Sequence, residues 1–342
     1  MNNDTKRLVV VAGAGGFIGG SLVARLRAAG QKRIRAVDIK PLHKWYQRFD
    51  DVENLVLDLN VKQNCEMTAR GASDIYNLAA NMGGMGFIES NKALCMLSVL
   101  INTHMLQAAV DQKAERFFYS SSACVYNADK QKSFEAPSLK EEDAYPAMPE
   151  DGYGWEKLFS ERMCRHFRED FGLYTRMARF HNVYGPWGTW DGGREKAPAA
   201  ICRKVIEAKL SGKHEIEIWG SGEQTRSFMY IDDCLKGIDL IMKSGILEAI
   251  NLGSSEAVTI NQLVDLAEEF AGIKLRRKYN LDAPKGVNGR NSDNTLIKKL
   301  LDWEPNTSLR TGLERTYYWI YDQYKARERG EAGVVRESSV SS

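Results

Sequence analysis

The sequence lacks a strong excess of either charge, a long lipid-like run and a recognisable export signal. Its 47 Lys and Arg face 45 Asp and Glu, for a formal net charge of +2, so no basic field favours nucleic acid or a membrane surface. No apolar run is expected to span a membrane, and residues 1–7 lack the apolar core of a signal peptide. We therefore expect a cytoplasmic protein that binds neither nucleic acid nor membrane.

The cysteines lack the spacing of a metal site. There are six, at positions 65, 95, 124, 164, 202 and 234, and no two are close enough for a Cys-x-x-Cys pair. In a chain this long they do not imply a disulfide scaffold either. We predict no bound metal, and reduced thiols that are mostly buried as small hydrophobic groups.

What the sequence does contain is an alternation of short β-branched runs and helical patterns. A buried strand at residues 7–12 is followed by a helix from Ile18 to about Ala29, and further strand patterns follow it. Such alternation predicts an α/β fold with a Rossmann-type, doubly wound parallel sheet. The further predicted strands span residues 34–38, 55–58, 74–78 and 116–120.

A glycine-rich turn joins the first predicted strand to the first helix. The run 13–19 reads Gly-Ala-Gly-Gly-Phe-Ile-Gly, and glycines there let the backbone approach a pyrophosphate at the helix N-terminus. Asp38 ends the second strand about twenty residues later, where a carboxylate binds a ribose diol and favours NAD over NADP. The positive charge of Lys40 nearby weakens the preference for NAD over NADP. Asp58 follows a strand and is either an adenine contact or a strand-end cap.

Tyr153 and Lys157 lie four residues apart, so they share one face of a helix. A lysine cation beside a phenol favours the phenolate, a base for a hydroxyl proton. Ser122, at the end of the fifth strand, is placed to hold the substrate oxygen. The predicted cofactor contacts are Gly13, Gly16, Phe17, Ile18, Gly19, Asp38, Asp58, Tyr153 and Lys157.

The pattern also predicts how the chain is divided. Residues 1–182 form the NAD-binding Rossmann domain, to which the chain returns at about 227–253. Residues 183–226 and 254–330 form a smaller mixed α/β substrate-binding lobe, and 331–342 form a polar, mobile tail. The helix at 91–110 is apolar nearly all round, which either a subunit interface or its own domain explains.

These motifs together resemble the extended short-chain dehydrogenase/reductases of the nucleotide-sugar class. Within that class the chain is similar to the GDP-mannose 3,5-epimerases, over about residues 7–325. The resemblance rests on the runs at 81–88, 121–124, 179–186, 192–198, 224–233 and 289–294, of which Gly-Gly-Arg-Glu-Lys-Ala-Pro at 192–198 is among the most specific.

The resemblance implies a homodimer, a tightly bound NAD that each cycle regenerates, and GDP-mannose or a related GDP-hexose as substrate. The implied products are GDP-L-galactose and GDP-L-gulose. Tyr153 with Lys157 would accept the 4-hydroxyl proton, and Cys124 and Lys196 would be the acid/base pair. The implied substrate-binding residues are Gly83, Ser122, Ala123, Cys124, Asn182, Glu195, Lys196, Ala197, Lys204, Gln224, Thr225, Arg226 and Arg290, the two arginines suiting a diphosphate.

The chemistry also stands on its own argument. Oxidation at C4 makes the hydrogens on C3 and C5 adjacent to a ketone, so both become removable. Inversion then needs a base on one face and an acid on the other, for which Cys124 and Lys196 serve if their pKa values move toward neutrality. Which of the two is the acid stays open. The alternatives are a 4-epimerase of the same fold, which needs no such pair, and a catalytically silent NAD-binding scaffold or sensor.

Overall fold

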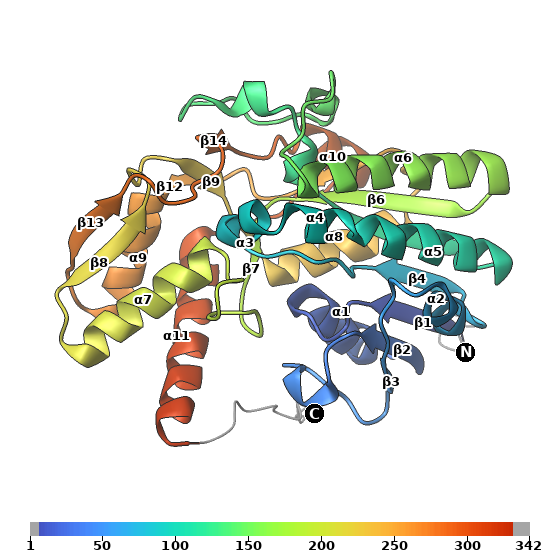
Figure 1. Cartoon of the computed structure of the whole chain (residues 1–342), viewed down its shortest axis with the longest axis horizontal. Coiled ribbons are helices and arrows are strands. Elements are labelled where there is room, and N and C mark those ends of the chain that lie inside the picture. Colours follow the sequence, from blue (N-terminus) through green and yellow to red (C-terminus); the bar gives the residue numbers. More distant parts are fainter. Residues whose placement is uncertain (1–6, 331–342) are drawn as a thin grey trace.

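A seven-stranded parallel sheet forms the centre of the molecule (Figure 1). The computed structural model describes residues 7–330. The strand order is β11-β6-β5-β4-β1-β2-β3, which reverses direction beside β1 and makes the sheet doubly wound. The strands are β1 (Leu8–Ala12), β2 (Arg33–Asp38), β3 (Glu53–Val56), β4 (Asp74–Asn77), β5 (Arg116–Ser122), β6 (Tyr174–Phe180) and β11 (Ile250–Leu252). The predicted fold class is confirmed.

The pleat of β1 explains why helices cover both faces of the sheet. Val9 and Val11 belong to one hydrophobic cluster, and Val10 and Ala12 to the other, because successive side chains of a strand point to opposite faces. Burying each such valine contributes about 1.5–3 kcal/mol. One cluster includes residues of α1 (Phe17–Ala28) and α8 (Ile231–Lys243), and the other those of α2 (Lys62–Ala69), α5 (Ser98–Asp111) and α6 (Tyr153–Phe171).

The third strand lies two residues earlier than the predicted 55–58. Its register with β2 pairs Arg35 with Glu53 and Asp38 with Val56. The Arg35 guanidinium also donates to the Glu53 carboxylate at 2.9 Å. Pairing along the sheet edge therefore recruits polar residues that carry no strand pattern of their own. The sequence analysis also did not identify β6 and β11 as strands.

The apolar stretch predicted as one helix at 91–110 is two helices. They are α4 (Lys92–Met96) and α5, which meet at Leu97, and α3 (Met85–Ser90) precedes them. In the part of the chain that the structure describes, Lys92–Asp111 alone is long and apolar enough to span a membrane, with a mean hydropathy of 1.6. The prediction that no run reaches that composition was wrong. A buried core helix passes the same test, and this stretch is 44% buried, with α5 packed against α2 and α6.

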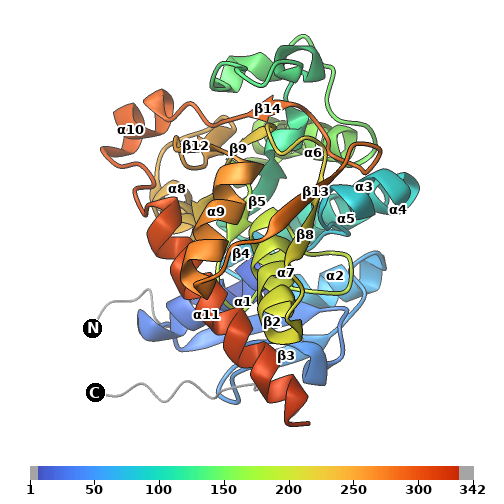
Figure 2. The same ribbon diagram turned by 90° about the vertical axis from the view of Figure 1, so that its left-hand side faces the viewer.

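The chain also forms three small sheets. The helices α7, α9 and α11 and the strands β8 and β13 lie beyond one end of the large sheet in Figure 1, and Figure 2 shows them from that end. The helix α7 packs against both α9 and α11. The sheets pair β8 with β13, β12 and β14 with β9, and β10 with β7. The bounds are β7 (Val183–Tyr184), β8 (Glu215–Trp219), β9 (Thr225–Ser227), β10 (Met229–Tyr230), β12 (Ala257–Thr259), β13 (Arg276–Asn280), β14 (Gly289–Arg290), α7 (Ala197–Ser211), α9 (Ile260–Ala271), α10 (Thr295–Leu301) and α11 (Leu309–Glu328).

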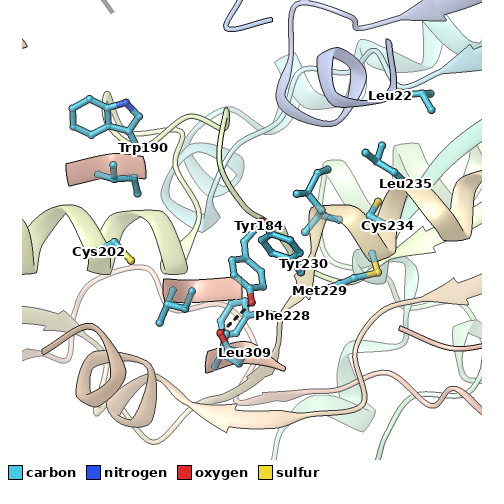
Figure 3. Packing of buried hydrophobic residues seen from close by; sticks show 14 of the residues in the cluster. Leu22, Tyr184, Trp190, Cys202, Phe228, Met229, Tyr230, Cys234, Leu235 and Leu309 are labelled. Atoms are coloured by element: carbon cyan, nitrogen blue, oxygen red, sulfur yellow. Dashed lines mark hydrogen bonds between the residues drawn. The ribbon is translucent and has the colours of Figure 1, made fainter. Parts of the chain in front are cut away.

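An aromatic cluster joins these elements to the large sheet (Figure 3). Tyr184 meets Phe228 and Tyr230 edge to face, with ring centroids 6.3 and 5.8 Å apart. Its hydroxyl donates to the carbonyl oxygen of Leu309 at 3.3 Å, at the start of α11. The hydrogen bond satisfies a buried phenol and fixes α11 against β7 and β10.

The chain rejoins the large sheet after its first excursion, because β11 pairs in parallel with β6. The predicted division of the chain into an NAD-binding domain, rejoined at about 227–253, and a substrate-binding lobe stays a prediction. The predicted tail at 331–342 lies outside the described residues.

Candidate active site

The predicted site residues gather at the carboxyl ends of the parallel strands. The loops that leave β1, β4 and β5 lie beside one another there, because these strands are neighbours in the order β5-β4-β1. The switch in strand order between β1 and β4 opens the crevice in which ligands bind to such sheets. The fold thus brings the glycine turn and the Tyr153 segment to one edge.

The turn after β1 is closed so tightly that side chains do not fit. Gly13 has φ +84° and donates its amide to the Val37 carbonyl at 2.8 Å. A Cβ atom on Gly13 would lie 2.9 Å from the Ala79 amide nitrogen. One on Gly19 would lie 2.1 Å from the Gly13 carbonyl oxygen, so α1 packs directly on the turn. Both glycines are required by packing.

The N-terminus of α1 fits a pyrophosphate. Its cap, Gly16, is extended and provides no side-chain hydrogen bond, and its first turn holds no acidic residue. The first amides of the helix, from Phe17 and Ile18 onward, have no intrahelical acceptor and attract an anion. The geometry therefore suits the cofactor that the sequence predicted, and the chain provides the cradle from its backbone.

Asp38 and Asp58, the two carboxylates predicted to contact the cofactor, accept different hydrogen bonds within the protein. Asp38 ends β2, is buried, and accepts a hydrogen bond from the Lys40 amide at 2.9 Å. The Lys40 ammonium donates to the Gly15 carbonyl at 3.2 Å and so lies at the glycine turn. Asp58 accepts from the amide and side chain of Asn60 at 2.9 and 2.8 Å. Asp58 thus caps a strand end, and its contact with adenine stays a prediction.

Tyr153 begins α6 and lies against Ser122, the last residue of β5. The Ser122 side chain acts on the phenol and lowers its pKa, though less than burial raises it. Lys157, one turn further on, lies 5.5 Å from the Tyr153 ring centroid and 3.7 Å from a Glu156 carboxylate oxygen. The pair therefore exists, but Lys157 is shared with a buried acid.

Burial opposes the activation of Tyr153 that its spacing from Lys157 predicts. It raises the pKa of Tyr153 well above its ordinary value, and the charges of Cys124 and Glu156 raise it further. The role of Lys157 in favouring the phenolate stays a prediction. The desolvation of the phenol is the larger effect.

A cavity of about 260 Å³ opens beside Tyr153. It brings together nearly all the predicted substrate contacts from loops far apart in the sequence. Thr225 is not in its wall, because its hydroxyl turns away to donate to the Phe134 carbonyl at 2.7 Å. The predicted residues that line the cavity are Gly83, Ser122, Ala123, Cys124, Tyr153, Asn182, Glu195, Lys196, Ala197, Lys204, Gln224, Arg226 and Arg290.

Cys124 is the cysteine of the cavity wall. It sits in a 3₁₀ turn at Ala123–Val125, whose N-terminal residue Ser122 accepts a hydrogen bond from the Cys124 amide at 3.2 Å. Burial raises the pKa of its thiol to about 11, and the nearby Glu150 carboxylate raises it further, while Arg290 lowers it. A thiol with this pKa is protonated at neutral pH.

Lys196 occupies the N-cap position of α7, without a capping hydrogen bond from its side chain, and it lines the same cavity. Burial lowers the pKa of its ammonium, the charge of Cys124 raises it, and Arg290 lowers it further. In the described residues no acceptor takes a hydrogen bond from this side chain. An unpaired, desolvated lysine loses its proton readily, as proton transfer requires. The residue pair that the sequence singled out therefore shares one cavity.

Arg226 and Arg290 both line the cavity, but they differ in whether a carboxylate of the described residues forms an ion pair with them. Arg226 donates to the carbonyls of Thr225, Lys285 and Val287 at 2.7, 3.0 and 2.5 Å, and burial lowers its pKa to about 10. Within the described part of the chain no carboxylate pairs with it. A diphosphate would compensate that buried charge. Arg290 is already paired, and donates to the Gln131 amide oxygen at 2.7 Å.

Other predicted contacts shape the wall. The Glu195 carboxylate accepts from the Gly193 amide at 2.7 Å and from Arg203 at 3.0 Å, which orders the glycine-rich loop before α7. Asn182, at φ +37°, donates to the Ser227 carbonyl at 3.1 Å. These two side chains hold loops of the cavity wall in place.

Several residues at the cavity were not among the predicted substrate contacts. Glu217, Trp219 and Lys285 line it, and the Trp219 indole donates to the Glu217 carboxylate at 2.9 Å. Glu150 stands just behind the wall and pairs with Arg290. No motif marks these residues. The one available signal was the position of Glu150 three residues before Tyr153, and it does not predict a contact with β14.

Residues 9–253 match the NAD dependent epimerase/dehydratase family. This range contains almost the whole large sheet. The chain belongs to this family. The predicted superfamily, the assignment as an enzyme and the use of NAD are confirmed, and the glycine turn with Asp38 has the form that this cofactor requires.

Curated relatives in this family are similar over nearly the whole chain. GDP-mannose 3,5-epimerase of Arabidopsis thaliana is 46% identical over 328 residues, which cover 96% of this chain and 85% of the relative. GDP-mannose 3,5-epimerase 1 of Oryza sativa subsp. japonica is also 46% identical, over 93% of this chain and 82% of the relative. The predicted resemblance is thereby confirmed.

Solved structures share the fold. UDP-glucose 4-epimerase of Thermotoga maritima superposes with a TM-score of 0.82 over 92% of this chain and 99% of that one, at 23% identity. MoeE5, solved with UDP-glucuronic acid and NAD, gives a TM-score of 0.77 at 28% identity, over 92% and 99% of the two chains. The fold is thus shared with proteins that were solved with different sugar nucleotides.

Proposed function

We propose that this chain is an epimerase that converts GDP-mannose to GDP-L-galactose, with GDP-L-gulose as a second product. The support is the similarity to plant GDP-mannose 3,5-epimerases at 46% identity together with a cavity that holds Tyr153, Cys124 and Lys196. The cavity also holds Arg226, with which no carboxylate of residues 7–330 forms an ion pair, for the diphosphate. We further propose that the enzyme works in the cytoplasm.

The first task of the site is to make a ketone at C4. Bound NAD supplies the hydride acceptor at C4 and later the hydride donor. Tyr153 accepts the proton of the 4-hydroxyl, and Ser122, within hydrogen-bond reach of the phenol, holds the same oxygen. Lys157 beneath the ring stabilises the phenolate once the hydroxyl proton has been taken.

The second task is to invert neighbouring carbons. With C4 as a ketone, loss of the C5 or C3 proton gives an enolate, which the carbonyl oxygen stabilises. One member of the Cys124 and Lys196 pair removes the proton and the other returns one to the opposite face. Reduction of C4 then restores the alcohol, so the reaction involves no net oxidation.

One observation carries this proposal: Cys124 and Lys196 line the same cavity as Tyr153, and burial moves the pKa of Lys196 downward. A 4-epimerase needs Tyr153 and Lys157 but has no task for a second acid/base pair. No observation favours that alternative.

The test is incubation with GDP-mannose in heavy water, with NMR to locate deuterium. Solvent deuterium at C5, and at C3 for the doubly inverted product, is the expected result. Turnover at C4 without label at either carbon contradicts the proposal and leaves a 4-epimerase.

We also propose that the enzyme is a homodimer. Leu94, Met96, Leu97 and Leu100 are exposed on α4 and α5, and Phe159 is 53% exposed on the adjacent α6. Figure 1 shows these helices side by side along one face of the molecule. A second copy of the same face would cover these apolar side chains, as in an isologous interface.

Replacement of Leu97 and Phe159 by Glu tests the interface in analytical ultracentrifugation. The expected result is a dimer for the parent chain and a monomer for the variant, while Leu281→Glu, at another exposed leucine, stays dimeric. Binding of the parent chain to neutral lipid vesicles, with no dimer in solution, contradicts the proposal and favours a membrane-bound α5.

A further inference from the structure

Glu156, the residue before Lys157 on α6, is a buried carboxylate that the proposed mechanism does not use. It is 3% exposed, and its Oε1 accepts hydrogen bonds from the Tyr119 phenol and the Ser160 hydroxyl, both at 3.0 Å. One donor lies on β5 and the other lies one turn further along α6. Two donors on one oxygen hold this carboxylate in a fixed place.

The second oxygen of Glu156 is left for Lys157. In residues 7–330 no group donates a hydrogen bond to this Oε2, and the Lys157 ammonium lies 3.7 Å from it. Lys157 is 1% exposed, and no other carboxylate of the described chain forms an ion pair with it. A buried ammonium is costly without an opposite charge. Glu156 is therefore the counterion of Lys157.

Two tyrosine rings complete the surroundings of Lys157. Its ammonium lies 4.7 Å from the ring centroid of Tyr119 and 5.5 Å from that of Tyr153. Opposite charges as close as those of Lys157 and Glu156 largely cancel at a longer distance. Much of the positive field of Lys157 is thus lost before it reaches the Tyr153 phenol.

The pKa of Tyr153 agrees with this cancellation. Burial raises it most, the charges of Cys124 and Glu156 raise it further, and Ser122 lowers it. The carboxylate beside Lys157 thus acts on the phenol in the direction opposite to the lysine. Tyr153 needs something more than Lys157 to become a phenolate.

The elements packed around this part of α6 bring other titratable groups close to Glu156, Lys157 and Tyr153. They are Cys95 of α4, Tyr119 of β5, Cys124 in the turn after β5 and Cys164 of α6. Glu161 on α6 pairs with Arg179, and the charges around Cys124 are those of Glu150, Lys196, Arg226 and Arg290. All of these stay in place when Glu156 alone is replaced, so a change at Tyr153 then reports the charge of Glu156.

We propose that Glu156 is a positioning residue that holds the Lys157 ammonium beside Tyr153 and offsets its charge, so that Tyr153 ionises only when a further positive charge enters the site. The oxidised nicotinamide of the cofactor carries such a charge, and the reduced form does not. This inference rests on the function proposed above for the role of Tyr153 as the base at the 4-hydroxyl. It adds the condition under which that base forms.

The charges of the site then balance on both sides of the oxidation. The carboxylate of Glu156, the ammonium of Lys157 and a neutral phenol carry no net charge together. When Tyr153 loses its proton to the solvent, the three groups carry one negative charge, which the positive charge of the oxidised cofactor offsets. Once the phenolate has taken the proton of the 4-hydroxyl, the three groups are neutral again.

Glu156→Gln keeps the shape of the side chain and removes its charge. The phenolate of Tyr153 then becomes the counterion of Lys157, so we expect Tyr153 to ionise at a pH lower by about one unit, which is about a tenfold larger phenolate fraction at a given pH. The measurement is an NMR titration of the protein as purified with NAD, with its tyrosines isotope-labelled at the ring carbon that bears the hydroxyl. Tyr153→Phe identifies the signal.

Three further variants separate charge from loosened packing. Glu156→Asp restores the charge and should return the Tyr153 titration toward that of the parent. Ser160→Ala removes a hydrogen bond to Glu156 but keeps its charge, so the titration should stay close to that of the parent. Glu268→Gln removes another buried carboxylate, which accepts from Lys274 at 3.0 Å outside the cavity, and should change nothing at Tyr153.

Two outcomes in a folded Glu156→Gln variant overturn the proposal. One is a Tyr153 titration equal to that of the parent. The other is a shift to higher pH, which would mean that Lys157 gives up its proton once the carboxylate is gone.

A second measurement needs no variant, so it decides the matter even if Glu156→Gln does not fold. Borohydride reduction of the bound cofactor in the parent protein removes the further positive charge. The Tyr153 signal should then titrate at a higher pH than in the oxidised protein. Equal titrations in the two forms contradict the proposal.

Neither titration uses GDP-mannose, so both separate this inference from the proposed function. A protein that shows the two shifts but does not epimerise GDP-mannose disproves the function and retains the control of Tyr153 by Glu156. A protein that incorporates deuterium but shows neither shift retains the function and disproves the role of Glu156.

Discussion

The cofactor cradle and the substrate cavity are built by different means. The cradle is made by a turn of seven residues, the N-terminus of α1 and Asp38, and it binds mainly through backbone amides. The cavity is made by side chains from loops between residues 82 and 290, many of them charged. The cradle is therefore set by local geometry and tolerates almost no added atom, whereas the cavity depends on pairings such as Arg290 with Glu150.

This difference predicts that the cofactor cradle and the substrate cavity can change independently of each other. A backbone cradle recognises what all its ligands have in common, the pyrophosphate and ribose. Side-chain pairings can change one at a time, so they decide which sugar carbons react. Substitutions in the two halves should consequently fail in different ways.

The largest effect is expected from Tyr153→Phe. This substitution removes a hydroxyl that belongs both to the predicted cofactor contacts and to the wall of the substrate cavity. Without its hydroxyl no proton leaves the 4-hydroxyl, and every later step depends on that ketone. We expect turnover of GDP-mannose and deuterium uptake to fall together, by about 10²–10⁴-fold. Bound NAD should be retained, as its absorbance after denaturation will show. A variant that keeps deuterium uptake contradicts this role.

Lys196→Ala should affect the cavity alone. Proton exchange at C3 and C5 is expected to fall by about 10²–10⁴-fold, while the transient reduction of bound NAD by substrate continues. Fluorescence at the NADH band and NMR in heavy water follow the two events. The matched control is Lys209→Ala on the same helix, whose ammonium donates to the Ala271 carbonyl at 2.8 Å; there, both signals should equal those of the parent.

Gly19→Ala should affect the cradle alone. The new Cβ would lie 2.1 Å from the Gly13 carbonyl, so α1 must shift, at a cost of about 1–3 kcal/mol. We expect lost NAD and a lower melting temperature, with the thiol chemistry of Cys124 retained. Gly245→Ala, where a Cβ meets nothing within 4 Å, is the control. Full NAD content in Gly19→Ala would show that the turn has room after all.

Asp38→Asn is expected to have the smallest effect. The carboxylate binds the ribose diol and repels a 2′-phosphate, and Lys40 at the glycine turn is ready to pair with that phosphate. We expect the preference for NAD over NADP, measured by competition for the apoenzyme, to fall by about tenfold. An unchanged ratio would mean that backbone contacts alone choose the cofactor.

The contrast between a cradle set by local geometry and a cavity built from distant loops also decides how much the sequence could predict. The turn at 13–19, Asp38 and the Tyr153 and Lys157 pair follow from spacing, because each lies within one strand, turn or helix. Cys124, Lys196 and Arg290 were found only through a resemblance, since no local rule joins loops so far apart. Glu150 was missed because its role exists only once β14 brings Arg290 to it.

The position of β3 was wrong because an edge strand takes its register from its neighbour and not from its own side chains. In the same way, the i,i+4 spacing of Tyr153 and Lys157 reveals the lysine but not the burial that raises the pKa of the phenol. The sequence shows which residues lie near each other within one helix or strand. It does not show how strongly the folded chain removes them from water.

The late return of the chain into the large sheet has a practical consequence. Because β11 pairs with β6 only after residues 183–249 have been made, a fragment that ends near Phe180 would expose the hydrogen-bonding edge of β6. An open, apolar edge strand invites pairing with other chains. The cofactor-binding half should therefore not be obtainable as a soluble fragment, and during synthesis it becomes complete only after most of the cavity's residues have left the ribosome.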